Sequence, residues 1–192
     1  MNHLLLGAAE TTDLLLALTK PRFLLIDDGP VADAFLARFP KARLFTPTVH
    51  SFDPLAGMDY KRARDFADIL YSASPGGKDT LTVRNGRRAL VRLLLAGPGR
   101  LSDMPKPGEV KDDAEKEALG MIEELLMSPV LSRVLCNGGK TFRLKEGTTV
   151  AKLDRAELGD FDAFILGALL MGQHKGQVIL SDGGFYLRLL HA

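Results

Sequence analysis

A carboxylate follows closely after an apolar run near the end of the chain. In the segment KGQVILSDGGFYL, the apolar residues 178–180 precede Asp182 and the glycine pair Gly183 and Gly184. A strand that ends in this way delivers its carboxylate to the carboxyl edge of a parallel sheet, where open α/β folds bind their ligands. The segment therefore predicts a ligand site at Asp182.

The start of the chain, HLLLGAAETTDLLLAL, has the pattern of a strand, a turn and a helix. Residues 3–6 (HLLL) have the pattern of a buried strand, and residues 10–13 supply polar first-turn side chains for a helix that runs to about residue 18. The turn between them and Asp182 resemble the two halves of a nucleotide site. The candidate nucleotide-binding residues are Gly7, Ala8, Ala9, Glu10, Thr11, Thr12 and Asp182.

The elements that would position these residues alternate between strand and helix patterns. Strands are predicted at residues 3–6, 23–26, 43–45, 141–144, 148–153, 177–180 and, at an edge, 185–190; further helices are predicted at residues 30–39, 59–71, 80–95, 112–127, 129–135 and 160–172. The β-α-β-α-β order at the start favours a parallel sheet with right-handed crossovers. We therefore expect a single α/β domain over residues 1–192, with a mainly parallel sheet flanked by helices and an all-helical insertion at about residues 59–136.

Composition limits the classes of function. The chain has 192 residues, 46% of them hydrophobic, which is enough for one domain with a substantial core. Its 25 basic and 24 acidic residues give no global field to attract nucleic acid or lipid. Cys136 is the single cysteine, and no apolar run approaches the roughly 20 residues of a membrane span. These features predict a soluble, cytoplasmic protein with no membrane partner.

Taken together, the order of elements resembles the motor domain of the FtsK/HerA group of P-loop ATPases, especially the conjugative coupling proteins and their relatives on phages and mobile elements. The matching features after the first strand and helix are the loop FDPL at residues 52–55, the run from Ala89 to Gly97, the stretch from Asp154 to Met171, and the strand that precedes Asp182. The resemblance covers most of the chain. It implies a RecA-like fold, ATP as ligand, Mg²⁺ at Asp182, a role in DNA transfer or translocation, and a homo-oligomer.

Both nucleotide motifs depart from the family pattern. A working phosphate loop reads G-x-x-x-x-G-K-[ST]; with Gly7 at its first position, Thr12, Asp13 and Leu14 stand where Gly, Lys and Ser/Thr belong. A carboxylate 4 Å from a phosphate repels it by about 4 kcal/mol at an effective dielectric constant of 20. Gly183 stands where the family has a Glu that polarises the attacking water. The sequence therefore predicts slow or no hydrolysis, and no catalytic residue is assigned.

Two alternatives to an ATPase-like protein stay open. The first is a non-catalytic binding or assembly module that keeps only the fold. The second is an unrelated enzyme that uses the acidic residues around Gly159, although a helix N-cap at Asp160 and a first-turn acid at Asp162 account for two of them. Asp27 and Asp28 follow the second predicted strand, where they form a turn or bind a ribose or a metal.

A basic stripe is the candidate surface for nucleic acid. Arg84, Arg88 and Arg92 recur every four residues and therefore share one face of the helix at residues 80–95. Such a stripe could follow a DNA phosphate backbone. The alternative is a solvated helix face without a partner.

Overall fold

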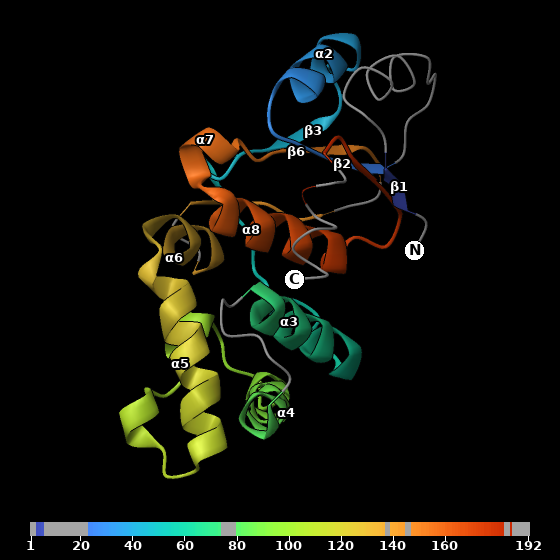
Figure 1. Cartoon of the computed structure of the whole chain (residues 1–192). Helices are drawn as coiled ribbons and strands as arrows, with labels where there is room; N and C mark the ends of the chain where they lie inside the picture. The colour runs from blue at the N-terminus through green and yellow to red at the C-terminus, as the bar shows by residue number, and fades with distance from the viewer. Residues whose placement is uncertain are drawn as a thin grey trace. The chain divides into compact units, whose positions relative to one another are not determined.

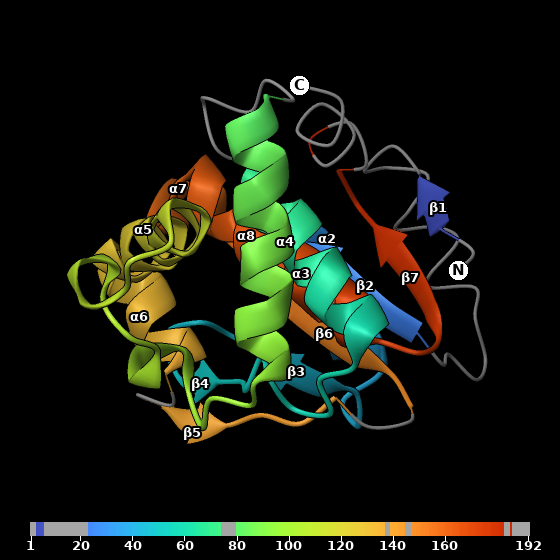
Figure 2. The ribbon, with the colours of Figure 1, turned by 90° about the horizontal axis from the view of Figure 1, so that it is seen from below.

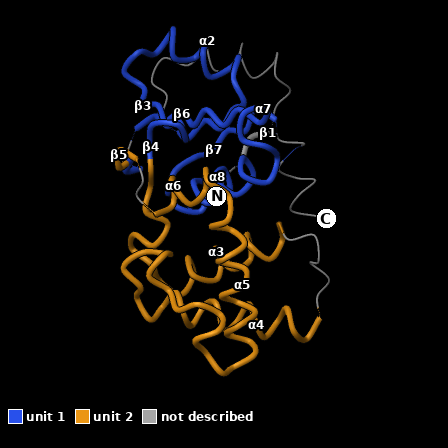
Figure 3. Tube along the Cα trace, turned by 90° about the vertical axis from the view of Figure 1, so that its left-hand side faces the viewer, with its two compact units in different colours: residues 1–50, 142–192 blue, residues 51–141 orange. Residues whose placement is uncertain are grey.

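The computed structural model describes residues 3–5, 23–73, 80–136, 139–144, 147–182 and 185. It divides the chain into two compact units, coloured separately in Figure 3. Unit 1 comprises residues 1–50 and 142–192, and unit 2 comprises residues 51–141. The helical insertion predicted at about residues 59–136 thus falls within unit 2. No helix in the described part of the chain is long and apolar enough to cross a membrane.

Unit 1 is built on a parallel five-stranded sheet of described strands. Its strands are β1 (His3–Leu5), β2 (Phe23–Asp27), β3 (Arg43–Phe45), β6 (Thr149–Lys152) and β7 (Gln177–Leu180). They lie in the order β1-β7-β2-β6-β3, which can be followed in Figure 2, and every pair is parallel. Because parallel strands all end at the same edge, the segments that follow β2, β6 and β7 share one edge of the sheet. This confirms the predicted α/β class with a mainly parallel sheet.

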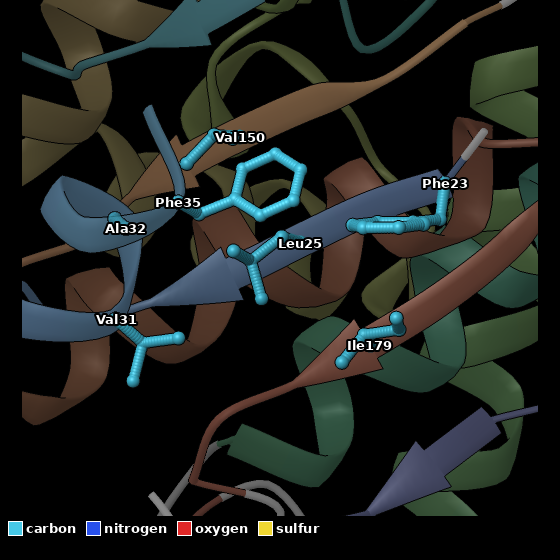
Figure 4. Close-up of a cluster of buried hydrophobic side chains, with 7 residues drawn as sticks. All are labelled: Phe23, Leu25, Val31, Ala32, Phe35, Val150 and Ile179. Atoms are coloured by element: carbon cyan, nitrogen blue, oxygen red, sulfur yellow. The ribbon is translucent and has the colours of Figure 1, made fainter. Parts of the chain in front are cut away.

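The central strand β2 is buried along its whole length, as expected for a parallel strand covered on both faces. On one face, Phe23 and Leu25 pack with Phe35 of helix α2 (Pro30–Arg38) and with Val150 and Ile179 of the neighbouring strands (Figure 4). The rings of Phe23 and Phe35 lie 5.5 Å apart in a tilted arrangement that aromatic pairs favour. This cluster fixes α2 against the sheet, so the start of α2 is held near the end of β2.

Helix α8 (Asp160–Gln173) covers the opposite face of the sheet (Figure 1). Its residues 162–170 are all buried, which is typical of a helix that is apolar on every side. A short helix, α7 (Arg155–Leu158), precedes it and was not predicted. Gly159 joins the two with a φ of 79°, a conformation that other residues rarely adopt. The predicted N-cap at Asp160 is wrong, because this turn makes Gly159 the N-cap; Asp162 does lie in the first turn.

Unit 2 is mainly helical in its described residues. It contains α3 (Tyr60–Ala73), α4 (Leu81–Leu95), α5 (Asp113–Met127) and α6 (Pro129–Leu135), with two 3₁₀ turns, η1 (Leu101–Asp103) and η2 (Pro107–Glu109). Helix α4 packs against both α3 and α5. Polar side chains cap the N-termini of three of these helices. Thr80 accepts a hydrogen bond from the N–H of Val83, Asp112 from two N–H groups of α5, and Ser128 from the N–H of Leu131.

The ends of unit 2 lie side by side. Strand β4 (His50–Ser51) pairs with β5 (Lys140–Thr141), and the Ser51 hydroxyl donates to the carbonyl of Gly139 at 3.0 Å. Neither β4 nor this pairing was predicted. The strand predicted at residues 141–144 is wrong beyond Thr141, because Phe142 instead packs its ring edge against Phe45, with centroids 5.3 Å apart.

The other described elements agree with the predicted ones to within a few residues. Each of the predicted strands at 3–6, 23–26, 43–45, 148–153 and 177–180 is present, and so are the predicted helices from residue 30 onward. The helix predicted to end near residue 18 lies outside the described residues. The same holds for the edge strand predicted at 185–190, apart from Phe185.

Gly86 lies at a close contact of α4 with side chains of α3 and α5. A Cβ at this position of α4 would stand 2.7 Å from Glu117 Cγ and closer still to the hydroxyl oxygen of Tyr71. Tyr71 is 2% exposed, and its pKa is raised to about 12, chiefly by burial and further by the charge of Glu117. A side chain at residue 86 would therefore force the buried Tyr71 ring and Glu117 to shift.

We expect Gly86→Ala to lower the free energy of unfolding by about 1–3 kcal/mol, since overpacking outweighs the gain in helix propensity. Gly120→Ala is the matched control, because a Cβ on this α5 glycine meets nothing within 4 Å. It should stabilise the chain by up to about 1 kcal/mol. Urea denaturation of both variants checks the sign. Equal effects at the two positions would contradict the packing account.

Candidate functional site

A small pocket lies at the carboxyl edge of the sheet in unit 1. It is lined by residues that follow or end three adjacent strands: Ile26, Asp27 and Asp28 from β2, Leu153 and Arg155 after β6, and Ser181, Asp182 and Phe185 after β7. The pocket and its open mouth enclose about 230 Å³ of empty space. Much of this space is open solvent, and the enclosed cavity measures only about 10 Å³, about the size of one water molecule. As it stands, the enclosed part of the pocket can therefore hold about one water molecule and not a nucleotide.

Arg155 joins two of these strand ends. Its Nη2 lies 3.0 Å from Asp28 Oδ2 and 3.1 Å from Asp182 Oδ2, so one guanidinium nitrogen bridges two carboxylates. Its guanidinium carbon also lies 4.7 Å from the ring centroid of Phe185, within range of a cation–π contact. The hydrogen bond to Asp28 raises the pKa of Arg155 further above its ordinary value, so the guanidinium stays charged.

Asp27 is the most deeply buried charged residue of the pocket, with 3% of its surface exposed. Its Oδ2 accepts hydrogen bonds from the N–H groups of Gly29 and Ala32, each at 2.8 Å. These two donors lie at the start of α2, where the helix dipole also stabilises a negative charge. Its other oxygen, Oδ1, is buried and has no hydrogen-bond partner in the described part of the protein. Asp27 thus stabilises the start of α2 through Oδ2, while Oδ1 accepts no hydrogen bond from the described residues.

The segment after β7 is tied back to the sheet. The N–H of Ser181 donates to the carbonyl of Ile26 at 3.1 Å, and the N–H of Phe185 donates to Asp182 Oδ1 at 3.1 Å. After β6, the N–H of Leu153 donates to the carbonyl of Asp27 at 2.8 Å. These backbone bonds fix the positions of Asp27, Arg155 and Asp182 relative to one another.

Of the predicted nucleotide-binding residues, Asp182 lies in this pocket. The six residues Gly7, Ala8, Ala9, Glu10, Thr11 and Thr12 lie outside the described residues, as do Asp13 and Gly183. Strand β1 does pair with β7 in parallel, with Leu5 opposite Leu180. The carboxyl ends of β1 and β7 therefore lie at the same edge of the sheet, and Asp182 follows β7 there.

The predicted basic stripe is present on α4, with Arg84, Arg88 and Arg92 all exposed. Arg92 Nη2 lies 3.8 Å from a carboxylate oxygen of Asp112 and 4.0 Å from one of Glu115, so acids near the start of α5 partly neutralise the stripe. Arg87, which lies beside the stripe, pairs with Asp68 at 3.3 Å.

Three acidic residues near Gly159 lie at the N-termini of helices α7 and α8. Asp154 accepts from the N–H of Ala156 at 2.9 Å and caps α7, while Asp160 and Asp162 lie in the first turn of α8. Among the described residues, no three His, Cys, Asp or Glu side chains are placed to hold a metal ion. A metal at Asp182 stays a prediction.

Sequence reasoning missed the role of Arg155. It stands among acids in the stretch LDRAELGD, where a single arginine has the pattern of an ordinary solvated charge. The available signal was its place just after a strand, like that of Asp28 and Asp182. Comparisons of the chain with protein-family models, with curated proteins and with solved structures found no match.

We expect Asp27→Ala to lower the free energy of unfolding by about 2–4 kcal/mol, because it leaves two N–H groups at the start of α2 without an acceptor. Asp33→Ala is the control: Asp33 is an exposed α2 residue that pairs with Lys152 at 2.9 Å, a kind of contact worth about 0–1 kcal/mol. Thermal and urea unfolding measure both. Similar losses in the two variants would contradict the capping role of Asp27.

Proposed function

We propose that the chain is an ATPase-like protein with a RecA-like fold of the FtsK/HerA type, whose degenerate site binds Mg-ATP weakly and hydrolyses it slowly or not at all. Its role would be in DNA transfer or translocation by a mobile element or a phage. The proposal rests on the sequence resemblance together with the arrangement of the sheet.

One observation supports the proposed site most directly. Leu5 of β1 is paired with Leu180 of β7 in a parallel ladder. The carboxyl ends of β1 and β7 therefore lie at one edge of the sheet, and in the sequence Gly7 follows Leu5, as Asp182 follows Leu180, by two positions. The pocket that contains Asp182 lies at the same edge, so the proposal puts both parts of the nucleotide site there.

The charges of the pocket support weak binding. Asp27, Asp28 and Asp182 outnumber the single guanidinium of Arg155, so an unaccompanied phosphate is repelled and needs a cation between it and the carboxylates. Asp13, in place of the usual Lys, adds to the repulsion. Since Gly183 also replaces the water-polarising Glu, the proposed site lacks both charge neutralisation and positioning of the nucleophile.

The contact between Arg155 and Asp182 favours a second candidate function. A magnesium-bound water would need Asp182 Oδ2 as an acceptor, but this oxygen is already paired with Arg155 Nη2 at 3.1 Å. A site whose magnesium-binding acid is already paired with an arginine of the same chain suits a binding or assembly module that keeps the fold without the chemistry.

Nucleotide binding separates the two candidates. If Mg-ATP binds, a concentration of 100 times Kd should raise the free energy of unfolding by about 2.7 kcal/mol. We expect a smaller shift at millimolar Mg-ATP, weakened further by Asp182→Ala but not by Asp33→Ala, and a turnover below about 1 per second, the low end of typical enzymes. The absence of any shift would favour the binding module. A turnover above that value, lost on Asp182→Ala, would contradict slow hydrolysis.

DNA binding is proposed through the stripe on α4. We expect the double variant Arg84→Ala/Arg88→Ala to weaken binding to duplex DNA similarly for all sequences. It should also reduce the slope of log K against log salt by about 1–2, because up to two phosphate contacts are lost. Lys61→Ala/Arg64→Ala on α3, also exposed, removes the same charge elsewhere on unit 2. Equal slopes for the two double variants would show that the stripe is a solvated face without a DNA partner.

Light scattering with and without DNA and ATP tests the proposed homo-oligomer, which a monomer under all conditions would contradict.

A further inference from the structure

Arg155 places one positively charged nitrogen between the ends of two adjacent strands. Its Nη2 lies 3.0 Å from Asp28 Oδ2, just after β2, and 3.1 Å from Asp182 Oδ2, just after β7. The two carboxylate oxygens are therefore no farther apart than these two distances combined. Carboxylate oxygens are also the ligands that Mg²⁺ and Mn²⁺ prefer in proteins. The guanidinium thus stands at the position that a divalent cation would take between these two acids.

The contacts of Asp182 hold the guanidinium in this position. Asp182 Oδ1 accepts a hydrogen bond from the N–H of Phe185 at 3.1 Å, and Oδ2 pairs with Arg155, so each oxygen already has a partner. The ring centroid of Phe185 lies 4.7 Å from the guanidinium carbon of Arg155, within range of a cation–π contact. The enclosed space left beside Arg155 is only about 10 Å³. A magnesium ion that keeps several of its waters does not fit into that space.

The neighbouring buried acid has compensation of its own. Asp27 accepts two backbone N–H groups at 2.8 Å and lies opposite Lys152 in the ladder of β2 and β6. Among the described residues, the basic side chain within ion-pair distance of Asp28 and of Asp182 is Arg155. Removal of its charge would leave two carboxylates close together without a counter-ion, and such a pair attracts a cation from solution.

We propose that Arg155 makes an autoinhibitory contact, in which its guanidinium takes the place of a divalent cation between Asp28 and Asp182 and keeps Mg²⁺ from this edge of the sheet. With Arg155 present, the residues do not fit a bound magnesium ion. Without it, the two acids can supply two oxygen ligands and water the others, because both side chains are more than a third exposed. The inference rests on the proposed function in taking Asp182 as the magnesium-binding acid, and it adds the residue that suppresses that site.

A purely structural ion pair leads to a different expectation. If Arg155 served only to hold the ends of β2 and β7 together, its removal would lower the free energy of unfolding and leave the affinity for divalent cations unchanged. An autoinhibitory arginine, by contrast, raises that affinity when it is removed. Cation affinity measured without nucleotide therefore separates the two roles.

The test is a titration of the full chain with Mn²⁺ at constant ionic strength, in which electron paramagnetic resonance measures free Mn²⁺. Mn²⁺ prefers the same oxygen ligands as Mg²⁺. We expect Arg155→Ala to bind one Mn²⁺ at least tenfold more tightly than the unmodified chain. Addition of Asp182→Asn to this variant should remove the gain. Arg38→Ala, which removes an exposed arginine at the end of α2 outside the pocket, should stay within twofold of the unmodified chain.

Equal Mn²⁺ affinity in Arg155→Ala and the unmodified chain would overturn the proposal. So would a gain that persists with Asp182→Asn, or an equal gain in Arg38→Ala. Should Arg155→Ala fail to fold, as judged by circular dichroism, Arg155→Gln replaces it under the same criteria, because Gln removes the charge and keeps most of the stem.

The nucleotide titration is decided separately. A gain in Mn²⁺ affinity with no stability shift by Mg-ATP would support the autoinhibitory contact and refute the nucleotide site. Binding of Mg-ATP by the unmodified chain, with no gain in Mn²⁺ affinity in the Arg155 variant, would support the nucleotide site and refute the autoinhibitory contact.

Discussion

Parallel strands bring their carboxyl ends to one edge, and in this chain two of those ends, those of β2 and β7, carry acids or are closely followed by them. Asp27, Asp28 and Asp182 cannot share that edge in the absence of compensation, because like charges at short range repel and burial increases the repulsion. Compensation includes two features: the start of α2 donates two N–H groups to Asp27, which also lies opposite Lys152, and Arg155 bridges Asp28 and Asp182. The arrangement of β2, β6 and β7 at this edge depends on both.

Local patterns in the sequence predicted the elements, but not the contacts between distant segments. The continuous apolar run of β2 and the four-residue spacing along α4 are properties of the residues themselves, so the strand and the helix could be read from them. The start of α6 was equally clear, because Ser128 and Pro129 have the residue types of an N-cap and a first helical position. By contrast, β4 and β5 are too short to show any period, and each exists through its pairing with the other.

In the candidate site, too, local patterns could be read from the sequence, whereas contacts between distant residues could not. A strand followed by Asp182 identified the edge of the sheet at which the pocket lies. Arg155 could not be recognised, since its significance comes from two carboxylates that are far from it in sequence. The two roles of Asp27 were not separable either: its turn-forming residue type accounts for the bonds to Oδ2, while only the packing around it shows that Oδ1 is buried without a donor.

The pairing of β4 with β5 has a consequence for the order of folding. Strand β3 must find β6 across the whole of unit 2, and the entropy lost in closing a chain loop grows with the logarithm of its length. Since the two ends of unit 2 are hydrogen-bonded neighbours, prior folding of residues 51–141 replaces that long loop by a short one. The saving is on the order of 2 kcal/mol. Prior folding of the inserted helices would then lower the entropic barrier to assembling the parallel sheet.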